Sequence, residues 1–214
     1  MRHTKSNTPG RERDSAIPEE GHATASALRV EFERVFKRDR PDDAARSCRL
    51  VGLIETPLGP MLAAASDRAV CWLEFTREFE RMRAEMRRRF GVCMVCGTNP
   101  VLERLRVEVR DYFRGRGRAF TVPIEMRGTE FQERVWAELQ RIPYGATASY
   151  EAVAQRVGSP SGARAVARAN ATNRLCLIVP CHRVIAKNGA LSGYSGGVWR
   201  KPLLLELERT GRLP

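Results

Sequence analysis

The residues of this chain that could most readily do chemistry lie in the run PCHRV, residues 180–184. Cysteine attacks an electrophile as its thiolate, and a free cysteine has a pKa of about 8.5. The histidine and arginine after Cys181 favour the thiolate, because positive charge near a thiol lowers its pKa. We therefore interpret Cys181 as a nucleophile. Cys176 lies inside the apolar run LCLIV and fits better the usual role of an intracellular cysteine, a small buried apolar side chain.

His182 is the candidate base for this thiol, although the two side chains should not touch directly. Neighbouring residues of an extended strand point to opposite faces. Either the backbone bends at Cys181, or a water molecule relays the proton from the thiol to the imidazole. A histidine that acts as a base is usually oriented by a carboxylate. The C-terminal segment KPLLLELERTG offers Glu206 and Glu208, and spacing alone does not choose between them.

Two predicted helices precede the cysteine. The first lies in ASYEAVAQRVG and ends at Gly158, and the second is ARAVARANA, with Ser161 as its expected N-cap. Two helices joined by a short turn of Gly and Ser are typical of a helix-turn-helix motif. Arg164 and Arg168 are four residues apart, so they share one face of the second helix. A helix of small residues with projecting arginines can lie close in a DNA groove.

The elements that must position these residues are predicted from hydrophobic spacing. Residues 1–47 are polar and charged and indicate a disordered tail that contains one amphipathic helix in SALRVEFERVFKR. From Cys48, three short apolar runs separated by turns predict an antiparallel meander. Helices follow in REFERMRAEMRRRF and TNPVLERLRVEVRDYF, and the alternation in AFTVPIEM predicts a further strand. A second unit begins near residue 128, where Thr129 and Gln132 form a capping-box pattern.

Composition narrows the partners and the location of the protein. The formal net charge of +12 favours a polyanionic partner, with nucleic acid first and an anionic membrane surface second. No apolar run reaches the length of a membrane span, and the N-terminal residues have no apolar signal core. We expect a cytoplasmic protein whose six cysteines are reduced thiols. Cys93 and Cys96 have CxxC spacing, but zinc would need two more ligands, so we predict packing there and no metal.

The helix pair, the run PCHRV and the run LSGYSGG together resemble the O6-alkylguanine-DNA alkyltransferases, also called methylated-DNA–protein-cysteine methyltransferases. The resemblance is close over residues 128–214, whereas residues 48–127 resemble the family's more variable N-terminal domain. It implies an α/β (α+β) fold. A small ribonuclease-H-like α/β domain, residues 48–127, would be followed by a mostly helical, winged-helix-like domain, residues 128–214, that carries the helix-turn-helix. Residues 1–47 have no counterpart.

The resemblance also implies an activity, which is the direct repair of DNA. The alkyl group of O6-alkylguanine, and also that of O4-methylthymine, would move irreversibly from double-stranded DNA to Cys181. Each molecule would act once, as a monomer, without a cofactor and in association with the nucleoid. Because the target atom lies inside a duplex, the damaged nucleotide would have to be flipped out.

The catalytic roles follow residue by residue from the resemblance. Cys181 would be the alkyl acceptor and His182 its water-linked base. The family's spacing selects Glu208 as the partner of His182, a choice that the residues alone left open. Asn173 would join the helix-turn-helix to the active-site turn. Tyr150 would help to rotate the nucleotide and contact its base.

The remaining roles concern DNA and the damaged base. Arg164 would fill the gap left by the flipped nucleotide, and Arg168 would bind DNA from the same helix face. Tyr194 and Ser195 would form the pocket loop around the alkylated oxygen. Val184 and Cys181 would offer their backbone carbonyls to the guanine amino group.

Two positions depart from the family pattern. Pro202 falls early in the last helix, so that helix would start late or kink, which bears on the position of Glu208. Cys176 stands where some members have a proline, which leaves the tolerance for bulky alkyl groups open.

Two other functions compete with alkyl transfer. A lesion sensor would bind DNA without chemistry, and the presence of Cys181 argues against it. A thiol hydrolase would use Cys181 and His182, but it would not explain Arg164 or the basic charge.

Overall fold

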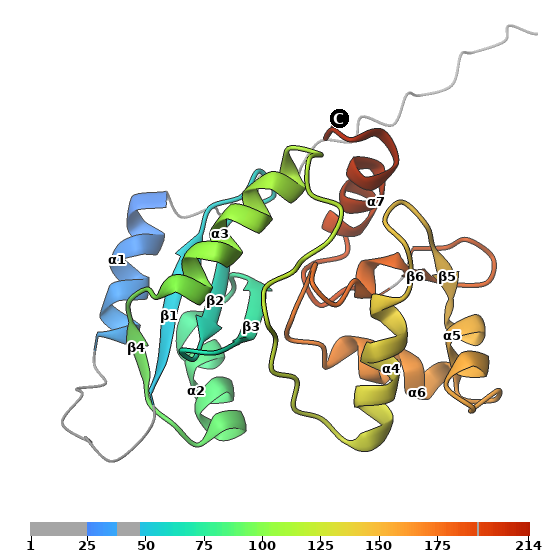
Figure 1. Cartoon of the computed structure of the whole chain (residues 1–214), viewed down its shortest axis with the longest axis horizontal. Helices are drawn as coiled ribbons and strands as arrows, with labels where there is room; N and C mark the ends of the chain where they lie inside the picture. Colours follow the sequence, from blue (N-terminus) through green and yellow to red (C-terminus); the bar gives the residue numbers. More distant parts are fainter. Residues whose placement is uncertain (1–24, 38–47, 192) are drawn as a thin grey trace, which may run out of the picture.

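The computed structural model describes residues 25–37, 48–191 and 193–214 of the chain. The N-terminal half holds a sheet with helices around it, and the C-terminal half is mostly helical (Figure 1). The mixed α/β fold predicted from the sequence is therefore confirmed. The predicted disorder of residues 1–47 falls outside the described residues, except for residues 25–37. These form α1 (Ala25–Phe36), the helix predicted within that tail.

The N-terminal sheet has four strands in the order β3-β2-β1-β4. They are β1 (Arg49–Ile54), β2 (Met61–Ala65), β3 (Val70–Phe75) and β4 (Met94–Cys96). The first three form the predicted antiparallel meander, whereas β4 pairs parallel to β1 at one edge. β3 lies at the other edge, next to the C-terminal half of the molecule (Figure 1).

Helices cover both faces of this sheet. Besides α1 they are α2 (Phe79–Phe90) and α3 (Pro100–Phe113). α1 and α2 pack with Leu62 and Ala64 of β2, whereas α3 packs with Met61 and Ala63 of the same strand. Successive residues of a strand point to opposite faces of the sheet, so β2 contributes side chains to two hydrophobic cores, one on each face. The helical spacing predicted the buried face of α2 correctly, which consists of Phe79, Met82, Met86 and Phe90.

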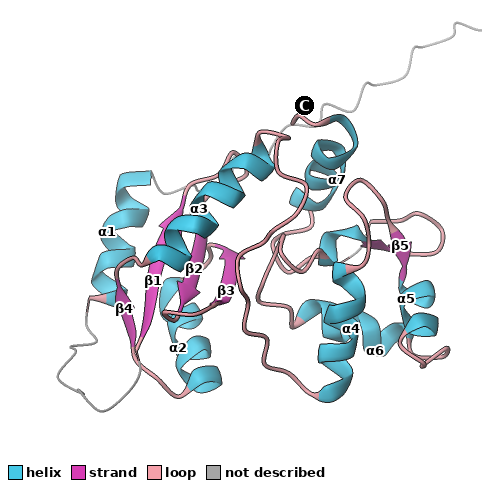
Figure 2. Ribbon diagram, in the orientation of Figure 1, coloured by secondary structure: helices cyan, strands magenta, loops and turns pink. Residues whose placement is uncertain are grey.

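The prediction of a strand in AFTVPIEM is wrong. Residues 114–129 run from the end of α3 to the C-terminal helices almost entirely as loop (Figure 2). One isolated bridge joins Ile124 to Val70, where the Val70 N–H donates to the Pro123 carbonyl and the Glu125 N–H donates to the Val70 carbonyl. Proline has no N–H to give to a ladder, which limits pairing on both sides of residue 123.

Four helices and two short strands form the C-terminal half. They are α4 (Glu130–Gln140), β5 (Ala148–Ser149), α5 (Tyr150–Arg156), α6 (Ala163–Ala171), β6 (Val184–Ile185) and α7 (Arg200–Thr210). The predicted capping box of Thr129 and Gln132 starts α4. Ser161, however, does not cap α6, because the turn that bonds the Gly162 N–H to the Ser159 carbonyl makes Gly162 the N-cap. Among the described residues, every helix is too short or too polar to cross a lipid bilayer.

The two halves are joined by backbone hydrogen bonds and by a partly buried arginine. The Leu73 N–H donates to the Arg174 carbonyl, and the Cys176 N–H donates to the Leu73 carbonyl. The Arg174 side chain binds Glu74 at 3.1 Å and Glu85 at 2.7 Å, and both glutamates belong to the N-terminal half. The chain that leads to Cys181 is thus held against β3.

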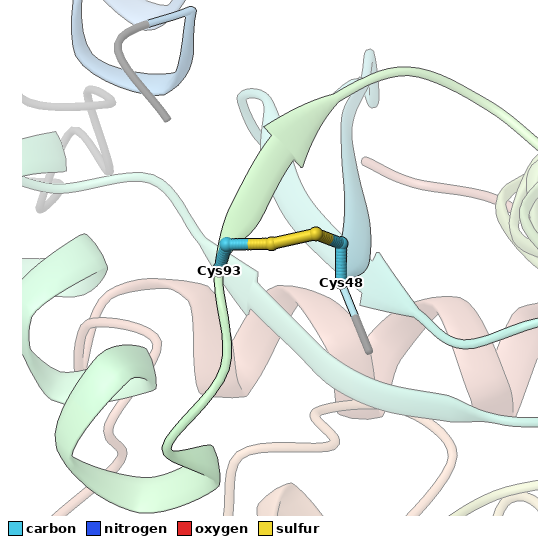
Figure 3. The surroundings of a disulfide bond; sticks show 2 residues. All are labelled: Cys48 and Cys93. Atoms are coloured by element: carbon cyan, nitrogen blue, oxygen red, sulfur yellow. A yellow bond between two sulfur atoms is a disulfide. The ribbon is translucent and has the colours of Figure 1, made fainter. Parts of the chain in front are cut away.

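A disulfide links Cys48 to Cys93 (Figure 3). The expectation that all six cysteines are reduced is therefore wrong, and the free cysteines are Cys71, Cys96, Cys176 and Cys181. The parallel register places Arg49 opposite Met94, so the residues just before them face each other with a Cα–Cα distance of 4.8 Å. The described residues contain no group of three or more His, Cys, Asp or Glu side chains arranged to hold a metal ion.

Candidate active site

Cys181 lies where the backbone bends. Residues Cys181–Arg183 form a 3₁₀ turn between Pro180 and β6, which is one of the two arrangements predicted for the cysteine and histidine. Leu177, four residues earlier, has a φ of 71°, a conformation that non-glycine residues rarely adopt. The Cys181 side chain is 3% exposed and reaches a cavity of about 630 Å³. The cavity is lined also by Tyr150, Glu151, Ala163, Arg164, Ala167, Asn170, Ala171, Ala186, Gly193, Tyr194 and Ser195.

Glu208 is the carboxylate that orients His182. Its Oε1 lies 2.8 Å from His182 Nε2, while Glu206 is paired with Arg209 on the outer face of α7. Arg183 donates twice to Glu208, at 2.8 and 3.0 Å. Burial would raise the pKa of Glu208, but the hydrogen bonds and charges of His182 and Arg183 outweigh it and lower this pKa to about 2. Glu208 is therefore ionised at neutral pH.

His182 has one nitrogen available for a proton. Its side chain is fully buried, and burial lowers its pKa below 6.5 despite the opposing effect of Glu208, so the ring is neutral near pH 7. Since Nε2 faces a carboxylate, it carries the hydrogen and donates it. Nδ1 is then an acceptor, and it is buried without a hydrogen-bond partner among the described residues.

Hydrogen-bond donors surround the Cys181 sulfur. Asn173 Nδ2 lies 3.2 Å from it and also donates to the Val179 carbonyl at 2.9 Å. A hydrogen bond from the Cys176 thiol is the largest effect on the pKa of Cys181 and lowers it; burial raises it, and Asn173 and the positive charge of Lys201 lower it again. The net pKa lies below that of an ordinary cysteine. Asn173 thus occupies the linking position that the resemblance implied.

Three residues near the site were missed by the sequence analysis. Lys201 is fully buried, and its Nζ donates to the Val184 carbonyl at 2.7 Å. Asn170 Nδ2 reaches the Cys181 carbonyl at 3.4 Å, and Tyr112 donates its hydroxyl to Glu208 at 2.8 Å.

The sequence held a signal for the burial of all three residues, but none for the contact between Tyr112 and Glu208. Lys201 precedes the buried Leu204 by three residues, and Asn170 follows the buried Val166 by four, so each shares a buried helix face. Tyr112 likewise follows the buried Val109 of α3 by three residues, but no local pattern pairs it with Glu208, which lies far away in the sequence.

The two arginines predicted to face DNA differ in their relation to the cavity. α5 and α6 form the predicted helix pair, and Arg164 and Arg168 are exposed on α6. Arg164 also lines the cavity, whereas Arg168 does not.

Of the remaining predicted pocket residues, three line the cavity and Val184 does not. Tyr150 and Ser195 line the cavity, as does Tyr194, whose hydroxyl is buried without a hydrogen-bond partner among the described residues. Burial raises the pKa of Tyr150 and Tyr194, so both hydroxyls keep their protons. The Val184 carbonyl is used by Lys201, although a carbonyl oxygen can accept a second hydrogen bond.

Pro202 does not displace the last helix. α7 begins at Arg200, so the proline occupies its first turn, where no intrahelical N–H bond is needed. The helix continues to Thr210 and brings Glu208 against His182. The late start or kink expected from the sequence is therefore wrong.

Two family models match the chain. Residues 50–126 match the 6-O-methylguanine DNA methyltransferase ribonuclease-like domain, and residues 130–210 match the 6-O-methylguanine DNA methyltransferase DNA-binding domain.

Individual relatives are similar to the chain over different lengths. A methylated-DNA–protein-cysteine methyltransferase of Mycobacterium bovis is 50% identical over 103 residues, which are 48% of this chain and 62% of that protein. The constitutive methylated-DNA–protein-cysteine methyltransferase of Bacillus subtilis is 38% identical over 72% of this chain and 92% of its own length. A crystal structure of Mycobacterium tuberculosis OGT in complex with DNA superposes with a TM-score of 0.66 at 36% identity, covering 78% of this chain and 95% of that one.

Proposed function

The chain belongs to the 6-O-methylguanine DNA methyltransferase family, and from that premise we propose that it repairs DNA by moving the alkyl group of O6-alkylguanine to its own Cys181. The observation that carries the proposal is the Cys181 side chain, which reaches a cavity of about 630 Å³ beside the His182–Glu208 pair. The cavity opens beside Arg164 of α6, the helix of small residues and arginines. A damaged base flipped out of a duplex would need such a recess.

The reaction is an in-line displacement at the alkyl carbon. His182 Nδ1 takes the thiol proton through a bridging water, and the charge of Glu208 stabilises the imidazolium that results. The Cys181 sulfur forms a bond to the alkyl carbon while the bond from that carbon to the guanine O6 breaks. The leaving guanine takes a proton from a tyrosine hydroxyl, and we assign this role to Tyr150 because it lines the cavity.

The product explains why each molecule would act once. A thioether is not cleaved by the groups that line this cavity, so Cys181 stays alkylated. The reaction consumes no cofactor, because the sulfur is itself the acceptor. The same displacement would serve O4-methylthymine, which also carries its methyl group on a ring oxygen.

DNA binding would depend on charge rather than on base sequence. Arg164 lies at the cavity mouth, where it can take the place of the flipped nucleotide, and Arg168 follows on the same face. Phosphate contacts carry no sequence information, as suits repair at any position. One chain holds all of the proposed catalytic groups, so we propose a monomer that associates with the nucleoid through DNA.

One assay tests the proposal against its competitors. Reduced protein is mixed with an equimolar amount of a duplex that contains O6-methylguanine, and the intact masses of protein and DNA are measured by mass spectrometry. We expect the protein to gain one methyl group and the duplex to lose it. Cys181→Ala should abolish transfer and keep duplex binding, and Cys96→Ala, a change of a free cysteine outside the cavity, should leave transfer unchanged.

The other outcomes identify the alternatives. Binding of the damaged duplex without transfer by the wild-type protein would indicate a lesion sensor. Repeated turnover of an ester or amide that depends on Cys181 would indicate a thiol hydrolase.

A further inference from the structure

Arg200 connects the loop of the lesion cavity to the N-terminal half of the molecule. Its Nη1 donates to the Gly196 carbonyl at 2.7 Å, in the loop that carries Tyr194 and Ser195. Its Nε donates to the Leu58 carbonyl at 2.7 Å, in the hairpin turn between β1 and β2. One guanidinium therefore bridges two segments that are far apart in the sequence.

Two aromatic rings enclose the same guanidinium. Its central carbon lies 4.4 Å from the centre of the Phe75 ring and 4.2 Å from that of Trp199. Both hydrogen bonds go to backbone carbonyls, and none goes to a carboxylate of the described residues. A charge that is taken partly out of water needs compensation, which charge-assisted hydrogen bonds and aromatic faces supply.

Glycines make room for this arrangement. A Cβ on Gly196 would lie 2.6 Å from the Tyr194 ring and 2.8 Å from the Phe75 ring, and real Cβ atoms do not approach that closely. A Cβ on Gly197 would lie 2.9 Å from Arg200 Nη1, and Gly197 has a φ of 97°. The cavity loop thus lies directly on the N-terminal half.

The start of α7 holds the loop at a second point. Lys201 Nζ lies 3.5 Å from the Gly193 carbonyl, while Arg200 binds the Gly196 carbonyl. These two anchors fix the position of the residues between them that line the cavity, Tyr194 and Ser195. Of the described residues that line the cavity, none precedes Tyr150, so the N-terminal half contributes no wall of its own.

We propose that Arg200 is a positioning residue for alkyl transfer, which fixes the cavity loop of residues 193–197 against the β1–β2 turn. The N-terminal half then controls how the damaged base is placed without touching it. This inference rests on the proposed function, because the loop acts on the base only if the cavity receives one. Lysine cannot replace the arginine, since an ammonium group lacks the planar fork that binds two carbonyls between two rings.

The test compares Arg200→Lys with Arg209→Lys, a matched change of an exposed arginine in the same helix that pairs with Glu206. Single-turnover transfer from an O6-methylguanine duplex is measured over a range of protein concentrations. A displaced loop should lower the limiting rate of Arg200→Lys by at least about tenfold. Arg200→Lys should keep the wild-type affinity for undamaged duplex and the wild-type rate at which iodoacetamide labels Cys181. Arg209→Lys should keep the wild-type limiting rate of transfer.

The pattern across these measurements separates positioning from a general loss of structure. If the limiting rate, the iodoacetamide rate and the melting temperature of Arg200→Lys fall together, the residue is merely structural and the inference is wrong. Should Arg200→Lys fail to fold, Phe75→Leu removes one ring of the enclosure and should lower the limiting rate in the same selective way. A wild-type rate in the folded variants overturns the inference, whereas a wild-type protein that transfers no methyl group overturns the proposed function and this inference with it.

Discussion

Glu208→Gln should change the stability of the protein in a way that depends strongly on pH. The Glu208 carboxylate accepts hydrogen bonds from Tyr112, His182 and Arg183, and its pKa lies at about 2 against an ordinary value of 4.5. A lowered pKa in the folded state means that ionised Glu208 stabilises the fold above pH 4.5. That stabilisation is lost as the pH falls toward 2.

The magnitude follows from the two pKa values. A difference from 4.5 to about 2 corresponds to about 3 kcal/mol of unfolding free energy. This is an upper value at pH 7, because the neutral His182 contributes no charge there and Arg183 alone supplies the positive partner. Glutamine keeps the size of the side chain and an acceptor for His182, but it leaves the Arg183 charge without its carboxylate.

Urea unfolding of both proteins between pH 7 and pH 2 measures this difference. Glu208→Gln should be less stable by up to about 3 kcal/mol at pH 7, and the gap should close toward pH 2. Glu206→Gln, which removes a solvent-exposed carboxylate paired with Arg209 in the same helix, should show both effects only weakly, because an exposed ion pair contributes little stability. Transfer by Glu208→Gln should also slow by about a hundredfold, since an uncharged partner no longer stabilises the His182 imidazolium. A stability gap that is the same at pH 7 and pH 2 would refute the reasoning.

The remaining predictions concern the thiol, the DNA contact and the disulfide. Cys176→Ala removes the hydrogen bond that lowers the pKa of Cys181, so the pH profile of iodoacetamide labelling should shift to higher pH, with Cys71→Ala as the unshifted control. Arg168→Ala should weaken binding to any duplex and reduce the salt dependence of log K by about one if it contacts a phosphate. Cys48→Ser opens a disulfide across 45 residues and should lower the unfolding free energy by about 4 kcal/mol under oxidising conditions, with no comparable loss in excess reductant.

The sequence predicted those elements whose cause is local. The three- and four-residue spacing of Phe79, Met82, Met86 and Phe90 marked the buried face of α2, and the capping-box pattern of Thr129 and Gln132 marked the start of α4. Such helix signals depend on a few neighbouring residues, so no knowledge of the tertiary fold is needed.

Features that depend on distant pairing were missed. The disulfide exists because β4 pairs parallel to β1, and nothing near Cys48 or Cys93 specifies that register. For Cys181 and His182 the residues alone left open a backbone bend or a water relay. The backbone does bend in a 3₁₀ turn, yet His182 Nδ1 has no hydrogen-bond partner among the described residues, so the water relay stays a prediction. The choice of Glu208 over Glu206 came from the family's spacing, and the structure supplies its physical reason, a buried network with Arg183 and Tyr112.

The same network bears on why a single cysteine would need two halves of a protein around it. From the N-terminal half, the Tyr112 hydroxyl donates a hydrogen bond to Glu208. Glu74 of the same half binds Arg174, which follows Asn173 in the sequence. The N-terminal half also holds Arg200, at the end of the cavity loop, through the Leu58 carbonyl. Each of these contacts supports a residue that in turn holds His182, Asn173 or the cavity loop in place. A protein that transfers one alkyl group does not need to release its product quickly. Rigid support around Cys181 therefore does not slow the reaction, and it holds the sulfur and the damaged base in the geometry of attack.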